Sequence, residues 1–230
     1  MKRVLDITLG VVALGFGVLA YSFLTLPDVR PLKTSNPSTT AFIELRAAEA
    51  RAKGQQPRRA QRWVAYRHIS PNLTRAVLVA EDDLFWQHEG LDIDQLQESL
   101  ATDWARGRLA RGGSTITQQL AKNLYLSPSK NPLRKLRELL IARRLEAELK
   151  KARILELYLN VIEWGDGVYG AEAAARYYFG VSAADLGPED AALLAAVIPK
   201  ARSYSHLPIT PYLEERQEAL LGQMEHVRIP

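Results

Sequence analysis

Carboxylates are crowded into one short stretch of this chain, just ahead of a strongly basic half. Between Glu81 and Asp103 there are eight acidic residues and no Lys or Arg. Between Trp104 and Arg153 there are thirteen Lys or Arg and three Glu. A solvated surface more often interleaves the two signs. This segregation therefore suits chemistry in which an ionised carboxylate works beside a highly anionic substrate.

Glu81 is the acid in this stretch that is best placed to act as a base. An N-cap and a proline at Ser70-Pro71 predict a helix whose apolar stripe runs to Leu84. Glu81 lies at the edge of that stripe, with Phe85 and His88 at i+4 and i+7 on the same side. A carboxylate at an apolar margin is partly desolvated, which raises its pKa and its basicity. The alternatives are a surface acid at a helix end and, for His88, a hydrogen-bonded structural role.

A second set of polar residues follows two glycines. Ser114 and Thr115 come directly after Gly112-Gly113, and Thr115 has the spacing of a helix N-cap. On that helix Thr115, Gln119 and Lys122 share one face at i, i+4 and i+7. A hydroxyl, an amide and an ammonium in a row suit a sugar or phosphate ligand. The alternative, that Thr115 only caps the helix and the other two side chains are solvated, stays equally open.

Arg134 and Glu138 lie one turn apart and face the same way. One interpretation is an ordinary i,i+4 ion pair that contributes a few tenths of a kcal/mol. The other is a second carboxylate held by an arginine that also binds anionic oxygen. Two carboxylates with several cations would suit glycosyl transfer from a diphosphate donor, because one acid can deprotonate the attacking hydroxyl while the cations take the charge of the leaving group. Local spacing does not choose between the two.

The bulk composition sets limits on the class of protein. A chain of 230 residues is long enough for one domain with a sizeable core. The net charge of +4 is too small to argue for nucleic acid, and no nucleic-acid-binding signature occurs. There is no cysteine, which excludes disulfides, thiolate catalysis and Cys-ligated metal sites.

The N-terminus predicts a membrane anchor. Residues 7–26 contain no charged residue, and a helix of that length spans about 30 Å, the thickness of the hydrocarbon core. Lys2 and Arg3 predict that the N-terminus stays in the cytoplasm and the rest of the chain lies outside it. A cleaved signal peptide is the alternative. We therefore expect a cytoplasmic tip and transmembrane anchor (1–27), a juxtamembrane linker with one short helix (28–62) and a globular domain (63–230).

The residue patterns in the globular part predict an almost entirely helical fold. Helical patterns cover residues 133–148, 152–162, 171–178 and 188–197. No run shows sustained period-2 alternation, so no β-sheet is predicted. In the linker, residues 53–62 carry four basic side chains and predict a solvated loop, with contact to anionic lipid headgroups as the alternative.

Taken together, these motifs resemble the peptidoglycan glycosyltransferases (glycosyltransferase family 51), and most closely the monofunctional biosynthetic transglycosylases among them. The five matching blocks are Glu81-Asp82-x-x-Phe85-x-x-His88-x-Gly90, Gly112-Gly113-Ser114-Thr115-Ile116-Thr117-Gln118-Gln119-Leu120-Ala121-Lys122-Asn123, Arg134-Lys135-x-x-Glu138, Ile154-Leu155-Glu156-x-Tyr158-Leu159-Asn160 and Gly167-x-x-Gly170-Ala171-x-x-Ala174-Ala175-x-Tyr177-Tyr178-Phe179-Gly180. Five blocks in the family's order are far more specific than any one of them. The resemblance extends from Phe42 to the C-terminus.

The resemblance implies a mostly α-helical, lysozyme-like domain with two lobes around a cleft that opens toward the membrane. It implies a lipid II substrate, a disaccharide-pentapeptide on undecaprenyl diphosphate, and a growing glycan chain. Glu81 matches the catalytic base that deprotonates the 4-hydroxyl of the acceptor sugar. That oxygen attacks the anomeric carbon of the growing chain with inversion, which forms a β-1,4 link and releases undecaprenyl diphosphate. Glu138 matches a second catalytic glutamate that assists the leaving diphosphate, directly or through a metal ion.

Further residues match family positions that bind substrate or shape the cleft: Asp82, Phe85, His88, Ser114, Thr115, Gln119, Lys122 and Arg134. Of these, Lys122 and Arg134 match residues that contact substrate phosphates or position Glu138. No cofactor is implied with certainty, and a divalent cation (Mg or Mn) at the donor diphosphate stays open. The implied location is the bacterial cytoplasmic (inner) membrane, single-pass, with the catalytic domain on the periplasmic side. The membrane itself and cell-division or elongation proteins are the further partners left open, and no nucleic acid is expected.

Two features depart from the family pattern. Many relatives follow a Pro-Lys-Ala run with another proline, whereas Arg202 follows Pro199-Lys200-Ala201 here, so the path of this loop is not predicted. No transpeptidase domain follows residue 230, so we expect uncrosslinked strands, and we interpret the isolated Ser127-x-x-Lys130 pattern as chance. Two other hypotheses are a lysozyme-like hydrolase and an inactive membrane-anchored scaffold. The basic half argues against the hydrolase, because a hydrolase has no diphosphate to bind.

Overall fold

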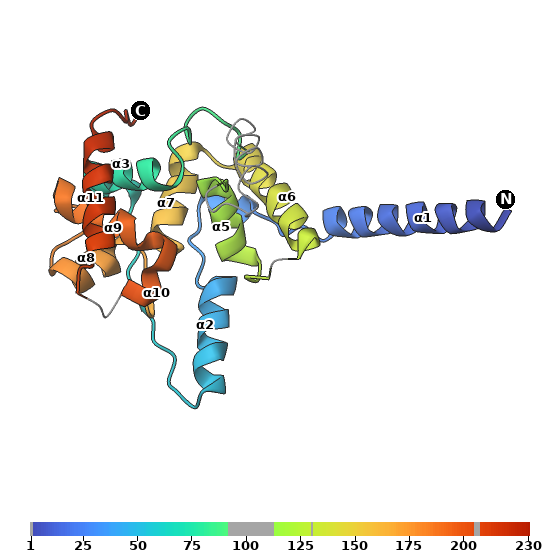
Figure 1. The fold of residues 1–230 in the computed structure, drawn as a ribbon, viewed down its shortest axis with the longest axis horizontal. Coiled ribbons are helices and arrows are strands. Elements are labelled where there is room, and N and C mark those ends of the chain that lie inside the picture. Colours follow the sequence, from blue (N-terminus) through green and yellow to red (C-terminus); the bar gives the residue numbers. More distant parts are fainter. Residues whose placement is uncertain (1, 92–112, 130, 205–207) are drawn as a thin grey trace.

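A computed structural model of the protein describes residues 2–91, 113–129, 131–204 and 208–230 (Figure 1). The predicted mostly helical fold is confirmed. The α-helices are α1 (Lys2–Leu24), α2 (Ala41–Ala52), α3 (Pro71–Glu81), α5 (Ile116–Tyr125), α6 (Pro132–Glu148), α7 (Lys151–Val161), α8 (Ala171–Phe179), α9 (Pro188–Val197), α10 (Ala201–Tyr204) and α11 (Pro211–Met224). Short 3-10 helices are η1 (Arg30–Lys33), η2 (Tyr66–His68) and η3 (Ile198–Lys200).

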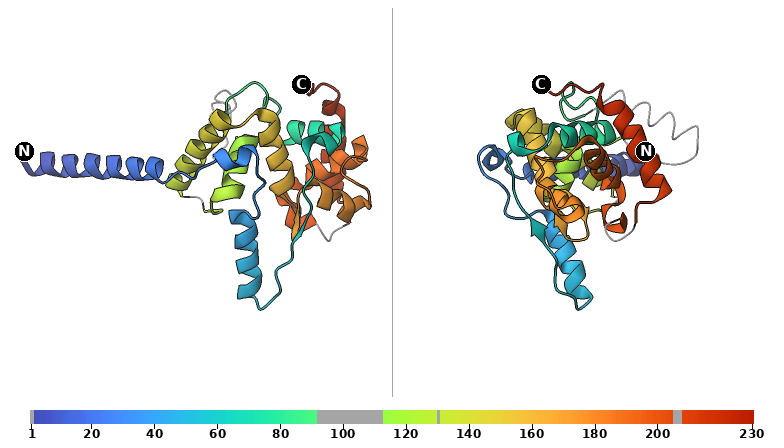
Figure 2. Two further views of the ribbon diagram at one scale, coloured as in Figure 1. Left: turned by 180° about the vertical axis from the view of Figure 1, so that it is seen from behind. Right: turned by 90° about the vertical axis from the view of Figure 1, so that its left-hand side faces the viewer.

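The helices form two groups that share one apolar core. Helices α3, α9 and α11 pack together, and α5 packs against α2, α6 and α7 (Figures 1 and 2). The largest fully buried side chains include Trp164, Tyr158 and Tyr169. Helix α1 projects away from this body, and both figures show its N-terminal end far from every other helix. The functional side chains described below lie where the two groups meet.

The helix boundaries follow from local chemistry that the sequence displays. Ser70 accepts a hydrogen bond from the Asn72 backbone N–H at 3.2 Å, and Thr115 accepts one from the Gln118 N–H at 3.2 Å. These caps satisfy donors at the first turns of α3 and α5, which would otherwise lack a partner. Helices begin at both of these predicted starts, and those predicted over 133–148, 152–162, 171–178 and 188–197 are present within one residue of their predicted ends.

One helix prediction is wrong in its length. Helix α3 ends at Glu81, so Leu84, Phe85 and His88 do not continue it. Asp82 leaves helical geometry with φ −171° and ψ 80°. Its buried carboxylate accepts a hydrogen bond from the backbone N–H of Ile116, at the start of α5. Because this partner comes from another helix, no local pattern could predict where α3 stops.

A small sheet was not predicted either. Strands β1 (Ala60–Gln61), β2 (Glu163–Gly165) and β3 (Val168–Tyr169) pair in the order β1-β3-β2, with β1 parallel and β2 antiparallel to β3. Strands of two or three residues are too short to show alternation. Gly167 has φ +75°, and a Cβ there would lie 2.6 Å from the Arg58 Cβ, so only glycine permits this approach. The expected solvated loop at 53–62 thus ends in a strand.

The structure does not show the predicted membrane helix either. Among the side chains that the structure describes, no helix combines the length and the apolar character needed to cross a bilayer.

Candidate active site

Glu81 lies in a cavity of about 590 Å³ between the two helix groups. We call this the Glu81 cavity. Its wall is built from Ala80, Glu81, Ser114, Gln119, Lys122, Ala196, Pro199, Lys200, Tyr204, Tyr212 and Arg216. The lining residues come from α3, from α5 and the residue before its N-cap, from the continuous stretch α9-η3-α10, and from α11, so parts far apart in the sequence must pack together before the cavity exists.

A chain of hydrogen bonds holds the Glu81 carboxylate in one orientation. The Gln119 Nε2 donates to Glu81 Oε2 at 2.8 Å, and the Tyr158 hydroxyl donates to Gln119 Oε1 at 3.0 Å. Burial raises the pKa of Tyr158 well above its usual 10, so this phenol keeps its proton and remains a donor. The Gln119 amide is therefore fixed with its NH₂ group toward Glu81.

Burial also raises the pKa of Glu81 above the usual 4.5, which the sequence predicted from its position at an apolar margin. The Gln119 hydrogen bond and the charges of Arg216 and Lys122 act in the opposite direction. These groups favour the ionised carboxylate, while the apolar surroundings make it more basic. A partly desolvated carboxylate of this kind is well suited to accept a proton from a hydroxyl group.

Asp82, the neighbour of Glu81, faces away from the cavity and holds the surrounding backbone. Its Oδ1 lies 2.8 Å from His88 Nε2, and its Oδ2 accepts from the Ile116 N–H at 2.8 Å. The His88 Nδ1 accepts a hydrogen bond from the Gly90 N–H at 3.1 Å. The ring proton is therefore on Nε2, which donates a hydrogen bond to Asp82. The pair joins the end of α3 to the start of α5. His88 thus has the structural hydrogen-bonding role that the sequence left open.

Thr115 and Phe85 also support the site without lining it. The Thr115 hydroxyl donates to the Gly90 carbonyl at 2.8 Å while capping α5, so of the three residues predicted on this face only Gln119 and Lys122 reach the cavity. Phe85 is fully buried, with its ring edge-to-face on Trp86. Both residues fix the segment that carries Glu81.

A second charged cluster lies beside the cavity, around Glu138 in α6. Glu138 is only 2% exposed, and its carboxylate is bound by Arg134 through one oxygen and by Lys135 through the other. Lys135 also donates to Ser114 Oγ at 3.0 Å, which joins the cluster to the cavity wall. The predicted Arg134–Glu138 pair is present, whereas Lys135 was missed because i,i+3 spacing on a basic helix gives no distinct signal.

Lys122 links the two carboxylates electrostatically. Burial lowers the pKa of its ammonium, the charges of Glu138 and Glu81 raise it, and those of Arg134 and Lys135 lower it further. The Lys122 ammonium forms no hydrogen bond or ion pair with any described residue, and it lies 5.9 Å from the Phe42 ring centroid. A partly buried cation without a partner among the described residues suits an anionic oxygen from a ligand.

The C-terminal segment supplies cavity residues that sequence reasoning missed. Lys200, Tyr204, Tyr212 and Arg216 all line the Glu81 cavity. The Arg216 Nε is buried without a hydrogen-bond partner among the described residues. The Pro199-Lys200-Ala201 run was the only signal for this segment.

Arg202, the departure from the family pattern, points away from the Glu81 cavity. It forms ion pairs with Glu49 at 3.4 Å and Asp166 at 3.5 Å, which tie α10 to α2 and to the turn after β2. Other predicted features, the acidic run from residue 92, the basic run to residue 111, Gly112 and Lys130, lie outside the described residues.

Comparison with known proteins identifies the family of the chain. The transglycosylase family profile matches residues 48–225. A biosynthetic peptidoglycan transglycosylase of Nitrosospira multiformis is 46% identical over 93% of this chain and 93% of that protein. A protein of the same name from Aromatoleum aromaticum is 48% identical over 85% of this chain and 84% of its own length, and one from Chromobacterium violaceum is 41% identical over the whole of both. The chain belongs to the transglycosylase family.

Proposed function

We propose that this protein is a peptidoglycan glycosyltransferase that polymerises lipid II into β-1,4 glycan strands and releases undecaprenyl diphosphate. The observation that carries the proposal is the placement of Glu81. It is a partly buried carboxylate of raised pKa, oriented by Gln119 in a cavity that Lys122 also lines. The names of the full-length relatives point to the same activity.

In this reaction Glu81 acts as the base toward the acceptor. The Glu81 oxygen that Gln119 does not bind takes the proton of the acceptor 4-hydroxyl, while the hydroxyl oxygen bonds to the anomeric carbon of the donor. The bond from this carbon to the diphosphate breaks, and its electron pair leaves with the diphosphate. The glycosidic bond forms on the face opposite to the leaving group, so the anomeric configuration inverts.

The cationic cluster is placed to stabilise the diphosphate as its negative charge grows. Lys122 has no competing hydrogen bond among the described residues, while Lys135 and Arg134 are held close by Glu138. Cations fixed in a partly buried site stabilise developing charge better than solvated ones, because they need not reorganise during the reaction. Glu138 therefore acts as a positioning residue that keeps two cations together beside the cavity.

A divalent cation at Glu138 does not fit the arrangement of these residues. Arg134 and Lys135 bind its two carboxylate oxygens. In the described part of the chain, no group of three or more His, Asp or Glu side chains comes together to hold a metal ion.

The proposal is tested by incubating the purified protein with lipid II and separating the products by size. Glycan polymer should accumulate with time, together with undecaprenyl diphosphate. A lysozyme-like hydrolase would instead shorten purified glycan and need no lipid-linked donor. Glycan shortening, or no polymer from lipid II, would contradict the assignment.

The pH dependence of the reaction should report Glu81. The active form is the ionised carboxylate, so activity is lost as pH falls through the folded-state pKa, and this acid limb should lie above the usual 4.5. The Gln119 amide lowers that pKa, so Gln119→Leu should move the acid limb of kcat/KM to higher pH. Gln87→Leu, which replaces an exposed amide, is the matched control. An acid limb that stays in place or moves down in Gln119→Leu would contradict this role.

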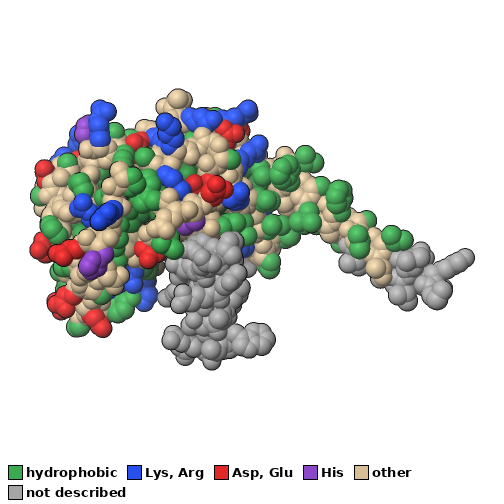
Figure 3. Space-filling model, turned by 90° about the horizontal axis from the view of Figure 1, so that it is seen from above, with side chains coloured by type: hydrophobic (Ala, Val, Ile, Leu, Met, Phe, Trp, Pro, Cys, Tyr) green, Lys and Arg blue, Asp and Glu red, His purple; other side chains and the backbone are tan. Residues whose placement is uncertain are grey.

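We further propose that α1 anchors the enzyme in the cytoplasmic membrane, with the domain on the periplasmic side. Large apolar side chains of α1 are exposed, among them Leu14, Phe16 and Leu24 at 69%, 73% and 81% exposure, and Figure 3 shows apolar side chains along the described part of the helix on the face that it draws. Such a surface is costly in water. Figure 3 shows basic side chains near the base of the helix on the face that it draws. Arg137 and Arg144 donate to backbone carbonyls of residues 25–27, just after α1. Cations at that level suit anionic lipid headgroups.

The membrane proposal has a direct test in cells. The full chain should stay with the membrane fraction after alkaline carbonate washing, and a protease added to spheroplasts should digest its C-terminal domain. A chain beginning at residue 28 should be released by the same wash. Release of the full chain by carbonate would refute the anchor, and protection of the domain from protease would refute its orientation.

A further inference from the structure

Two more cavities lie in a row with the Glu81 cavity. The first, which we call the middle cavity, has about 260 Å³ and shares Lys122, Pro199 and Lys200 with the Glu81 cavity. The second, the far cavity, has about 540 Å³ and shares Arg46 and Arg202 with the middle cavity. The row therefore runs from the Glu81 carboxylate, past α10, to the C-terminal end of α2.

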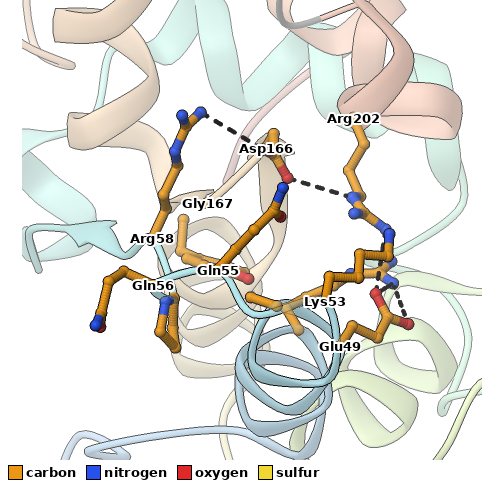
Figure 4. Close-up of a pocket in the computed structure, with 12 residues that line it drawn as sticks. Glu49, Lys53, Gln55, Gln56, Arg58, Asp166, Gly167 and Arg202 are labelled. Carbon is orange, nitrogen blue, oxygen red and sulfur yellow. Dashed lines mark hydrogen bonds and ion pairs between the residues drawn. The ribbon is translucent and has the colours of Figure 1, made fainter.

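The far cavity is built where α2 meets the small sheet. Its wall includes Lys53, Gln55 and Arg58 from the segment after α2, and Asp166 from the turn after β2 (Figure 4). Figure 4 shows Arg58 and Arg202 approaching Asp166 from opposite sides. The distances are 3.8 Å from Arg58 and 3.5 Å from Arg202. The parallel pairing of β1 with β3 fixes this segment, so the cavity is part of the folded domain.

Several polar groups of the far cavity are available to a ligand. The Lys53 ammonium has no hydrogen bond or ion pair with any described residue, and the Arg58 side chain is 73% exposed with only the long contact to Asp166. Gln55 and Gln56 add amides that can donate and accept. Cations and amides side by side suit a ligand that carries both carboxylates and neutral hydroxyl or amide groups.

Tyr169 gives an independent reason to expect a ligand here. It lines the far cavity and is only 1% exposed, yet its hydroxyl has no hydrogen-bond partner among the described residues. Leaving a buried hydroxyl unpaired costs free energy, and such groups are rare in folded proteins. Burial raises the pKa of Tyr169, so the group is a neutral phenol that can donate.

The direction of the row identifies which part of the substrate could reach it. In the proposed reaction the diphosphate of the donor lies by Lys122, Arg134 and Lys135, and the donor sugars extend from the anomeric carbon on the other side. Helix α6, which carries Arg134 and Lys135, lies on the side of α1, whereas the C-terminal end of α2 lies away from it (Figure 1). Lys122 lines both the Glu81 cavity and the middle cavity.

We infer that the far cavity is a binding site for the growing glycan, which takes sugars remote from the reacting end together with the carboxylates of their peptide stems. The inference rests on the proposed function and extends its donor site along α2. Lys53 and Arg58 bind the stem carboxylates, and Tyr169 donates to a sugar or amide oxygen. Such a site holds a long chain in place between successive additions. A donor of a single disaccharide is too short to reach the far cavity, so its reaction should not depend on these contacts.

The experiment compares two lipid-linked donors, a disaccharide and a chain of several disaccharides, each with the same labelled acceptor. The quantity measured is the ratio of kcat/KM for the long donor to that for the short one. In Lys53→Ala/Arg58→Ala this ratio should fall about tenfold, the effect expected when a charge-assisted contact is lost. Polymers that this variant makes from lipid II should also be shorter.

Two further variants keep the test sharp. Arg51→Ala removes a cation from an exposed position of α2 that lines none of the three cavities, and it should leave the ratio within about twofold of the wild type. Tyr169→Phe removes only the unpartnered hydroxyl, so the protein should unfold at the same temperature or higher while the ratio falls about threefold.

The outcomes separate this inference from the proposed function. A wild type that forms no polymer refutes the proposed function itself. Polymer formation with an unchanged ratio in Lys53→Ala/Arg58→Ala refutes the far cavity as a glycan site. An equal fall in Arg51→Ala also refutes it, because a general loss of positive charge would then explain the effect.

Discussion

Replacing Glu81 with Gln should lower the rate of lipid II polymerisation by about 10²–10⁴-fold, the contribution typical of a positioned general base. The amide has the same shape and still offers an oxygen to Gln119 Nε2, so the cavity keeps its form. It cannot take the proton of the acceptor hydroxyl. The initial rate of polymer formation is the measurement, and polymer at the wild-type rate would remove Glu81 from the role of base.

The same substitution should make the protein more stable at neutral pH. The folded-state pKa of Glu81 is raised by burial, so the folded protein holds this proton more tightly than the unfolded chain. The contribution of Glu81 to the free energy of unfolding therefore falls as pH rises from its unfolded-state pKa to its folded-state pKa, and it stays low at higher pH. Gln carries no charge and avoids the cost of burying an ionised carboxylate. The thermal midpoint of Glu81→Gln should therefore be higher than that of the wild type at neutral pH, and the difference should disappear at acidic pH.

Asp83→Asn is the control for both effects. Asp83 is two residues beyond Glu81 and is exposed, so removing its charge should change neither the rate nor the thermal midpoint appreciably. A gain in stability of similar size in Asp83→Asn would mean that net charge, and not burial of Glu81, explains the result.

Replacing Glu138 with Ala should cost about 3–5 kcal/mol of folding free energy, because it leaves buried charge without its partner. Glu138 is 2% exposed and binds Arg134, whose side chain is 17% exposed, together with the half-exposed Lys135. Urea unfolding measures the change. Glu89→Ala is the matched control, since Glu89 pairs with Arg143 on the surface at 80% exposure and should cost at most about 1 kcal/mol.

A double variant separates the structural role of Glu138 from its proposed role in the reaction. Replacing Arg134 and Glu138 together by Met substitutes an apolar contact for the buried pair, so most of the lost stability should return. Polymerisation should remain about 10²-fold below the wild type, because the cations beside the leaving diphosphate are no longer held together. A double variant that recovers stability and activity together would show that Glu138 only supports the fold.

Much of the architecture could be read from local patterns. Ser70 and Thr115 mark helix starts because their side chains cap the first turn, and these caps are present. The i,i+4 spacing of Arg134 and Glu138 predicts their contact because helix geometry brings them to one face. The strands were missed because two or three residues are too few to show a period.

The sequence by itself determined which residues are available for chemistry, because their types, their caps and their helical spacing are local properties. It predicted Glu81 and Glu138 as candidate catalytic residues and identified the family of the chain. Only the tertiary structure decided how they are held. Gln119 binds Glu81 across 38 residues of sequence, Tyr158 binds Gln119 across 39, and Asp82 at the end of α3 binds a backbone group 34 residues away. Contacts over such separations depend on how helices pack, and no pattern within one helix encodes them.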